Sequence, residues 1–212
     1  MCCKCRPVQA AKIRVLVTAS SPSTVGGHAA CQNQGNVIGR DNAGRLVAGA
    51  VLDLAIIGNG YFVVRDLAAN ECYATQAGNF SIDENGYLLT GTGARLQGRI
   101  GGALSRVGDL QINAAGLPPG SIPGSTMVCY AIDDWGKITV QLCDGAWFLC
   151  GQVMLQNFQD PQALISEGND LYSNMSAAGP LPALAAPGSN GLGVIQSGAL
   201  ELANAEQTSR PN

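Results

Sequence analysis

Apolar and polar positions alternate over short runs from residue 51 onwards, and this pattern predicts β-strands separated by turns. Runs 52–57 and 61–65 are rich in β-branched and aromatic residues, and Gly58 to Gly60 separates them. Asn85-Gly86 is a typical hairpin turn. The other predicted strands are 72–76, 78–82, 87–90, 109–112, 127–132, 137–143, 146–155, 171–175 and 194–198. The fold class predicted from this pattern is mainly β and turn-rich.

One hairpin is predicted in more detail, because Asp144-Gly145 is a strong two-residue turn. This turn sets Cys143 opposite Ala146, and side chains then alternate between two faces. The predicted core face comprises Ile138, Val140, Leu142, Trp147 and Leu149; the other face comprises Thr139, Gln141, Cys143, Phe148 and Cys150. Trp147 is interpreted as a core residue, and Trp135 as part of a turn.

The chain is predicted to have three regions. Residues 1–48 show little periodicity and are expected to be poorly ordered, residues 49–200 form the β domain, and residues 201–212 begin a short C-terminal helix. Within the β domain, residues 162–166 are predicted to form one helical turn, and the proline-containing stretch 179–193 a loop.

Composition and charge exclude several classes of function. The 212 residues carry a net charge of −3, whereas a nucleic-acid-binding domain needs a basic surface for phosphates. No uncharged apolar run approaches the roughly 20 residues that a membrane-spanning helix requires. Lys12 and Arg14 interrupt the apolar stretch near the start, so no cleavable signal peptide is predicted.

The eight cysteines do not show the paired spacing of a zinc site, although Cys2, Cys3 and Cys5 cluster near the start. In the predicted hairpin register, Cys143 and Cys150 share a face about four residues apart, or roughly 13 Å at the rise of a strand. A disulfide needs Cα atoms within about 7 Å, so this pair is expected to stay reduced. No metal site is predicted.

The candidates for catalysis are weak. His28 is the only histidine and has no neighbouring nucleophile, and Asp133-Asp134 precedes Trp-Gly as in a β-turn. The stretch Asp83 to Gly86 lacks the ligand spacing of a calcium-binding EF-hand loop. Gly58 and Gly60 lack the third glycine of a dinucleotide site. No catalytic residue, cofactor or small-molecule ligand is therefore predicted, and the chain is not expected to be an enzyme.

Three blocks of sequence carry a pattern that is specific when they occur together and in this order. Leu52 to Val64 reads LDLAIIGNGYFVV. Ala74 to Asp83 reads ATQAGNFSID and continues as Gly86-Tyr87-Leu88 and Leu96-Gln97-Gly98. The last block comprises Asn169 to Tyr172 (NDLY), Pro187 to Gly193 (PGSNGLG) and Gln196 to Glu201 (QSGALE). Across residues 52–204 the chain resembles the bacterial flagellar hook and basal-body rod protein family.

This resemblance implies a structural subunit of the hook or rod that polymerises with copies of itself and with other axial proteins. It also implies export through the flagellar type III apparatus without a cleaved signal peptide, localisation in the hook–basal body, and a role in motility. The SGALE block favours a minimal hook-like subunit, with the rod as the second choice. The family's paired terminal helices are not evident in residues 1–48 and begin only briefly after residue 201, so both are expected to be truncated.

Two alternatives come from other classes of function. A secreted or surface β-sandwich binding module would use Tyr61, Trp135 or Phe148 to hold a ligand, and low charge with many turns fits such a module equally well. A hydrolase or metalloenzyme is the least favoured. Within the flagellar interpretation, a non-assembling remnant of a hook protein is also considered.

Overall fold

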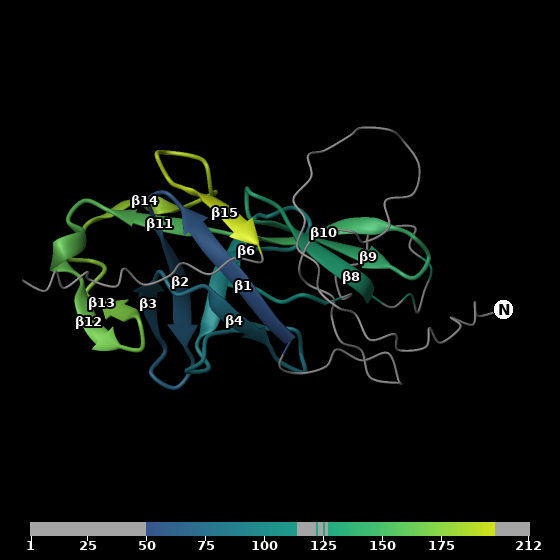
Figure 1. The fold of residues 1–212 in the computed structure, drawn as a ribbon, viewed down its shortest axis with the longest axis horizontal. Coiled ribbons are helices and arrows are strands. Elements are labelled where there is room, and N and C mark those ends of the chain that lie inside the picture. The colour runs from purple at the N-terminus through teal and green to yellow at the C-terminus, as the bar shows by residue number, and fades with distance from the viewer. Residues whose placement is uncertain (1–49, 114–121, 123–124, 126, 198–212) are drawn as a thin grey trace, which may run out of the picture. The chain divides into compact units, whose positions relative to one another are not determined.

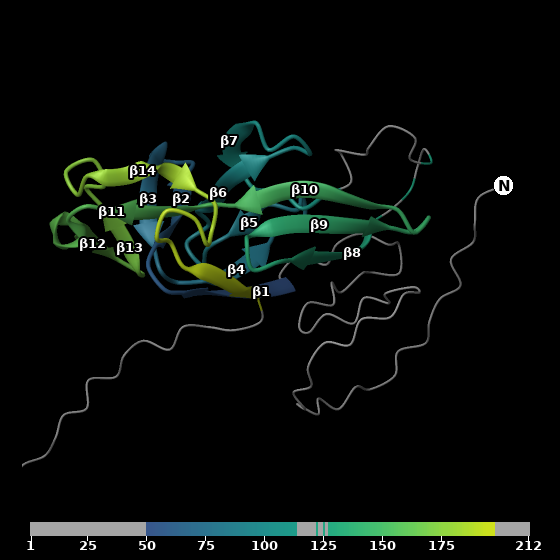
Figure 2. The same ribbon diagram turned by 90° about the horizontal axis from the view of Figure 1, so that it is seen from above.

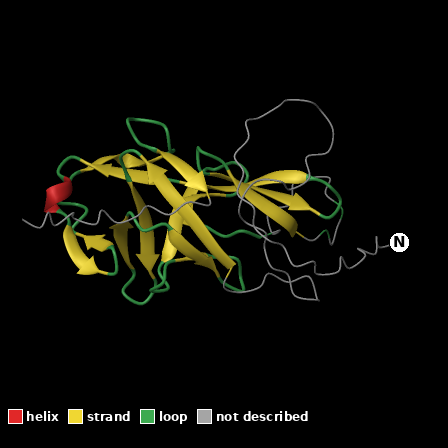
Figure 3. Cartoon of the chain, in the orientation of Figure 1, coloured by secondary structure: helices red, strands yellow, loops and turns green. Residues whose placement is uncertain are grey.

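The computed structural model of the chain describes residues 50–113, 122, 125 and 127–197. All of them belong to Asn33–Asn212, one of the two units into which the chain divides. This part is mainly β, as predicted, and its helical content is one short 3-10 turn (Figure 3). The expectations for residues 1–48 and 201–212 lie outside the described residues.

The strands follow one another along the chain with short connections. They are β1 (Ala50–Ile57), β2 (Tyr61–Asp66), β3 (Glu71–Thr75), β4 (Asn79–Ile82), β5 (Leu88–Leu89), β6 (Arg95–Ile100), β7 (Arg106–Asp109), β8 (Met127–Ile132), β9 (Lys137–Leu142), β10 (Trp147–Val153), β11 (Leu155–Phe158), β12 (Ile165–Gly168), β13 (Leu171–Ser173), β14 (Pro180–Ala185) and β15 (Val194–Ser197). The 3-10 turn, η1, spans Pro161–Ala163.

The strands form one 15-stranded antiparallel network with the main order β12-β13-β3-β2-β6-β5-β4-β1-β15. Strands β2 and β6 are branch points, because β2 also pairs with β11, and β6 also pairs with β7 and β10. Through β10, strand β6 connects to the hairpin partners β9 and β8, which extend away from β1 and β2 in both views (Figures 1 and 2). The first and last described strands, β1 and β15, lie side by side.

The core lies where the main sheet folds over itself. Phe62 and Phe80 are almost fully buried and meet edge to face, with ring centroids 5.3 Å apart. Leu52 and Leu54 from β1 and Leu96 from β6 pack in the same cluster. A second, smaller cluster gathers Ala74, Phe158 and Ala178.

The β9–β10 hairpin differs from its prediction by one residue. Gly145 has a φ of +87°, and the Leu142 amide donates to the Ala146 carbonyl at 2.9 Å, so the loop has three residues rather than two. A one-residue change of register moves the side chains of one strand, here β10, to the opposite face relative to those of its partner, β9. The predictions that Trp147 is a core residue and that Phe148 lies on the other face are therefore wrong: Trp147 is 44% exposed and Phe148 is buried.

The core assignments on the β9 side of this hairpin are confirmed, since Ile138, Val140 and Leu142 are buried. On β10 the register shifts between Leu149 and Gly151, as in a β-bulge. Cys143 and Cys150 remain thiols, as expected.

Three other segments differ from their predictions. The strand expected at 109–112 lies earlier, as β7, and the loop expected over 179–193 contains strand β14. Prolines are tolerated in β14 because it pairs with β11 alone, as an edge strand does. The helical turn expected at 162–166 is η1, and β12 begins two residues after it.

Candidate assembly surface

Two turns that are far apart in the sequence pack backbone against backbone. The Gly193 amide donates to the Asn59 carbonyl at 2.7 Å. A Cβ atom on Gly193 would lie 2.5 Å from the Ile57 carbonyl oxygen, and one on Gly58 would lie 2.9 Å from the Gly193 Cα. Gly58 also has a φ of +119°, which side chains disfavour. This close contact explains one glycine in each of two sequence blocks, Gly58 in the first and Gly193 in the last.

The third block packs against the same strand. A Cβ atom on Gly78 would lie only 1.5 Å from the Leu54 carbonyl oxygen, and the Leu54 amide donates to the Gly78 carbonyl at 2.9 Å. Only glycine fits at this position without movement of the backbone. Strand β1, which belongs to the first block, therefore contacts both of the other blocks.

The pairing of β1 with β15 brings the two limits of the described domain together. Ile57 pairs with Val194 and Leu54 with Ser197 in an antiparallel register. Because the strands run in opposite directions, the start of β1 and the end of β15 lie toward the same end of the pair (Figure 1). The described part of the chain thus begins and ends on neighbouring strands.

A charged network crosses β2, β6 and β7. Arg65 donates two hydrogen bonds to the Asp109 carboxylate, from Nε to Oδ1 at 3.0 Å and from a second guanidinium nitrogen to Oδ2 at 2.6 Å. Arg95 donates to Oδ2 at 3.0 Å, and the Gln97 amide donates to Oδ1 at 2.7 Å. The Arg95 guanidinium also stacks over the Tyr87 ring, 3.7 Å from its centroid.

The network changes the ionisation of its carboxylate. Burial raises the pKa of Asp109, but hydrogen bonds from Arg65, Gln97 and Arg95 outweigh burial and lower the pKa to about 2. The same interaction raises the pKa of Arg65. The sequence alone does not predict this network, because Arg65 and Asp109 are 44 residues apart and show no local pattern.

The carboxylates that the sequence offered as candidates for catalysis or calcium binding stabilise turns instead. Asp133 Oδ1 accepts hydrogen bonds from the amides of Trp135 and Lys137. Asp83 does the same for two amides in its own turn. Within the described ranges, no group of three or more His, Cys, Asp or Glu residues is placed to hold a metal ion. His28 and the N-terminal cysteines lie outside those ranges.

A cavity of about 270 Å³ lies beside β6, β7 and β10, and its lining includes Arg106, Asp109, Gln111 and Cys150. The Cys150 thiol donates to the Gln111 carbonyl at 3.1 Å, and burial raises the pKa of this thiol. A raised pKa disfavours the thiolate, which is the nucleophilic form of cysteine. The cavity therefore lacks an activated nucleophile at Cys150.

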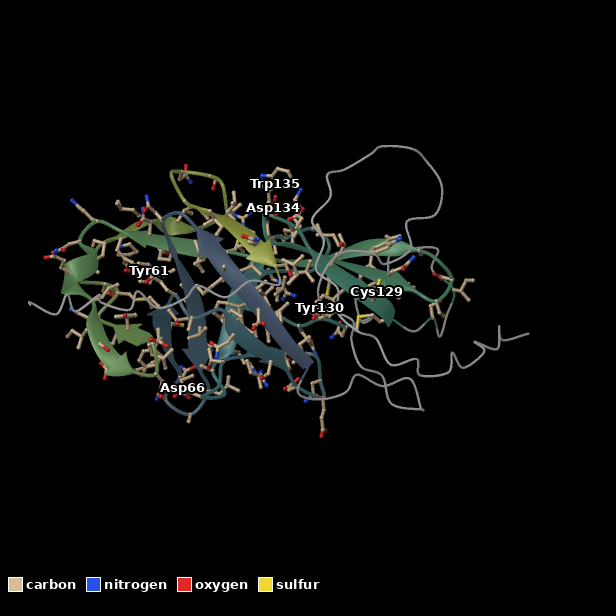
Figure 4. The ribbon with its side chains drawn as sticks, in the orientation of Figure 1. Tyr61, Asp66, Cys129, Tyr130, Asp134 and Trp135 are labelled. Atoms are coloured by element: carbon tan, nitrogen blue, oxygen red, sulfur yellow. The ribbon has the colours of Figure 1, made fainter. Side chains whose placement is uncertain are left out.

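The three aromatic residues proposed for a binding module are not brought together. Tyr61 packs edge to face against Phe158 and Tyr172, with ring centroids 5.5 and 6.1 Å away. Phe148 is buried, whereas Trp135 is 57% exposed at the β8–β9 turn. Figure 4 shows Tyr61 and Trp135 on separate parts of the structure. These three residues therefore do not form a single stacking platform for a ligand.

No helix in the described part of the chain is long and apolar enough to cross a membrane. The prominent surface features of that part are the exposed Trp135 and Trp147, the unpaired edges of strands, and the arginines of β2, β6 and β7. Such features are suited to contacts between proteins.

The fold and its glycine contacts define a β domain in which the three sequence blocks pack together. Residues 55–140 match the family model described as the flagellar hook protein FlgE/F/G D1 domain. The chain belongs to the flagellar hook and rod protein family, as its sequence blocks predicted.

Individual relatives include both rod and hook proteins. The chain is 31% identical over 160 residues to the flagellar basal-body rod protein FlgG of Bacillus subtilis (strain 168), covering 76% of this chain and 53% of the relative. It is 33% identical to FlgG of Buchnera aphidicola subsp. Acyrthosiphon pisum over 72% of this chain and 50% of that protein. It is 28% identical to the flagellar hook protein FlgE of Escherichia coli (strain K12) over 70% and 40%, respectively. The chain spans about half the length of the rod proteins it matches.

Proposed function

We propose that this chain is a non-catalytic structural subunit of the axial part of the bacterial flagellum, in the rod or the hook. Its partners are copies of itself and other axial proteins, and it reaches its position through the flagellar export apparatus without a cleaved signal peptide. The observation that carries this proposal is the β1–β15 pairing, built from the sequence blocks that the chain shares with its family.

This pairing supports the proposal because it places the first and last described strands side by side, as a domain that projects from an axial core requires. In an axial polymer, repeated head-to-tail contacts between identical subunits build a helical filament. Such contacts need a rigid surface rather than reactive groups. The backbone contact between Gly58 and Gly193 fixes the other end of the same pair, where β1 ends and β15 begins.

The proposal is tested by the composition of purified hook–basal bodies from the source cell. Mass spectrometry should detect peptides between Ile138 and Leu164 in amounts comparable to other axial proteins. Trypsin is unsuitable here, because the next lysine or arginine after Lys137 is Arg210, so chymotrypsin is used. A strain lacking the gene provides the control for peptide assignment.

Two outcomes separate a working subunit from the alternatives. Stoichiometric peptides in the particle support an axial subunit whose contacts come from the β domain. Absence from the particle while the protein is present in the cytoplasm contradicts the proposal and favours the non-assembling remnant.

A further inference from the structure

The positive charge of the described residues is concentrated on neighbouring strands. All four of their arginines lie on β2, β6 and β7. Arg65 pairs with Arg95 across β2 and β6, and Arg99 follows Arg95 at the spacing that returns a side chain to the same face. Asp109 is the carboxylate that binds two of these three arginines. We call Arg65, Arg95 and Arg99 the arginine face.

Part of the arginine face is open to solvent. The Arg65 side chain is 34% exposed and that of Arg95 is 22% exposed. Arg99 is exposed, and it makes no ion pair with any described residue. The face thus has three positive charges against one carboxylate, in a chain whose net charge is −3.

Negative charge gathers next to Arg65, on the end of β2 and on the strands β3 and β12. Asp66 pairs with Glu71 across β2 and β3, and Tyr73 donates to Glu71 Oε2 at 3.1 Å. Glu167 lies on β12, whose partner β13 pairs with β3. The Ser173 hydroxyl of β13 donates to Glu167, and β13 pairs with β3 through Tyr172 and Ala74, so Glu167 lies beside the strand that carries Glu71. The hydrogen bond to Glu71, burial, and the charges of Glu71, Asp66 and Glu167 raise the pKa of Tyr73. We call these three carboxylates the acidic patch.

The two charged surfaces cannot meet within one molecule, because they belong to opposite faces of the sheet. Arg65 pairs with Cys72, whereas the adjacent pair Asp66 and Glu71 points to the other side. None of the three patch carboxylates forms an ion pair among the described residues. Opposite charges on opposite faces fit a head-to-tail contact between two copies, which repeats without closing on itself.

We propose that the arginine face docks the acidic patch of a second copy of this chain. This inference rests on the proposed function and names the contact that the axial assembly would use. The charge complementarity selects a second copy as the occupant, since both halves of the contact are present on every subunit. Arg99 is the central residue, because its charge is not engaged within its own molecule by any described residue.

The test measures self-association of the full chain by sedimentation velocity at low and high salt. Assembly should weaken between about 0.1 M and about 1 M NaCl, where the Debye length falls from about 10 Å to about 3 Å. Arg99→Glu should weaken assembly about tenfold or more, because a like-charge contact across an interface is strongly unfavourable. Glu71→Lys with Glu167→Lys should weaken it similarly, and combining all three changes in one chain should recover assembly.

Matched controls separate a specific contact from a general change of charge. Arg106→Glu makes the same charge change as Arg99→Glu on the opposite face, since Arg106 pairs with Ile100 and Arg99 with Val107. Glu84→Lys adds positive charge at the exposed β4–β5 turn. Both controls should assemble within about twofold of the wild type, in line with the small effects of distant surface charges.

Each result decides between distinct conclusions. A wild-type chain that stays monomeric at all concentrations overturns the contact between two copies, whereas the proposed function is decided separately by the peptides found in purified hook–basal bodies. A wild-type chain that assembles while Arg99→Glu and the lysine pair assemble equally well overturns only the charge contact. If Arg99→Glu instead abolishes binding to phosphatidylserine vesicles and leaves assembly unchanged, an anionic membrane is the occupant, and the inference is wrong.

Discussion

Neutralising Asp109 should change how the stability of the domain depends on pH. In the folded protein the pKa of this carboxyl falls from 3.8 to about 2, because hydrogen bonds from Arg65, Gln97 and Arg95 outweigh burial. A tenfold difference in proton affinity between the folded and unfolded protein corresponds to about 1.4 kcal/mol. Solvent screens the partly exposed arginines, so we expect the ionised network to contribute about 1 to 2 kcal/mol to the free energy of unfolding.

The sign of the effect follows from the lowered pKa. A carboxyl whose pKa is lowered by folding stabilises the protein above its unfolded value, and this stabilisation is lost as the pH falls toward about 2. Asp109→Asn should therefore be less stable than the wild type at pH 7. The difference should shrink between about pH 5 and pH 2.5, because the wild type loses the charge that the variant never had.

Urea unfolding followed by circular dichroism at several pH values measures this difference directly. Glu84→Gln is the matched control, since it removes an exposed carboxylate that forms no ion pair with a described residue. Its stability should follow that of the wild type at each pH. If the free energies of unfolding of the wild type and Asp109→Asn change in parallel from about pH 7 to pH 2.5, the reasoning is refuted.

Three further predictions test other parts of the structure. Gly78→Ala should prevent folding or lower the free energy of unfolding by more than about 3 kcal/mol. Gly91→Ala is its control and should fold normally, because the added Cβ meets nothing within 4 Å. Soluble yield and melting temperature check both variants. Phe148→Ala should lower the free energy of unfolding by about 3 to 5 kcal/mol, because Phe148 is buried, and Trp147→Ala should lower it by under about 1 kcal/mol, because Trp147 is exposed. Urea unfolding measures both, and the reverse order would contradict the register of the hairpin. Burial raises the pKa of Tyr130 to about 12, so the stability that its neutral phenol contributes is lost as the pH rises from about 10 through 12. In urea unfolding over this pH range, Tyr130→Phe should lose stability less steeply than the wild type, and an equally steep loss would contradict the assignment to Tyr130.

Local signals predict the elements whose turns are unambiguous. Strand β8 has the predicted bounds, because an apolar run is followed at once by an Asp-Asp-Trp-Gly turn. The presence of the β9–β10 hairpin is predictable for the same reason. Its register is not, because Asp144-Gly145 fits a two-residue turn and also the end of a three-residue loop with Gly145 at positive φ. The difference is one residue, and it exchanges the positions of Trp147 and Phe148.

The remaining features depend on contacts that no short window of sequence contains. Strand β14 contains prolines, and only the presence of β11 beside it makes this segment a strand. The arginine face is assembled from β2 and β6, and its carboxylate comes from β7. The sequence indicates only that the glycines of the family blocks separate strands, whereas the structure gives three of them, Gly58, Gly78 and Gly193, a packing role.

The pairing of β1 with β15 also constrains when the domain can fold. The first described strand finds one of its two neighbours only in the last, so the sheet cannot be completed until nearly the whole domain is available. Pairings between residues so distant in sequence carry a large loop-closure cost and slow the folding of β proteins. A chain that emerges from its N-terminus therefore leaves one side of β1 unpaired until its final strand is available, even if hairpins between neighbouring strands form earlier.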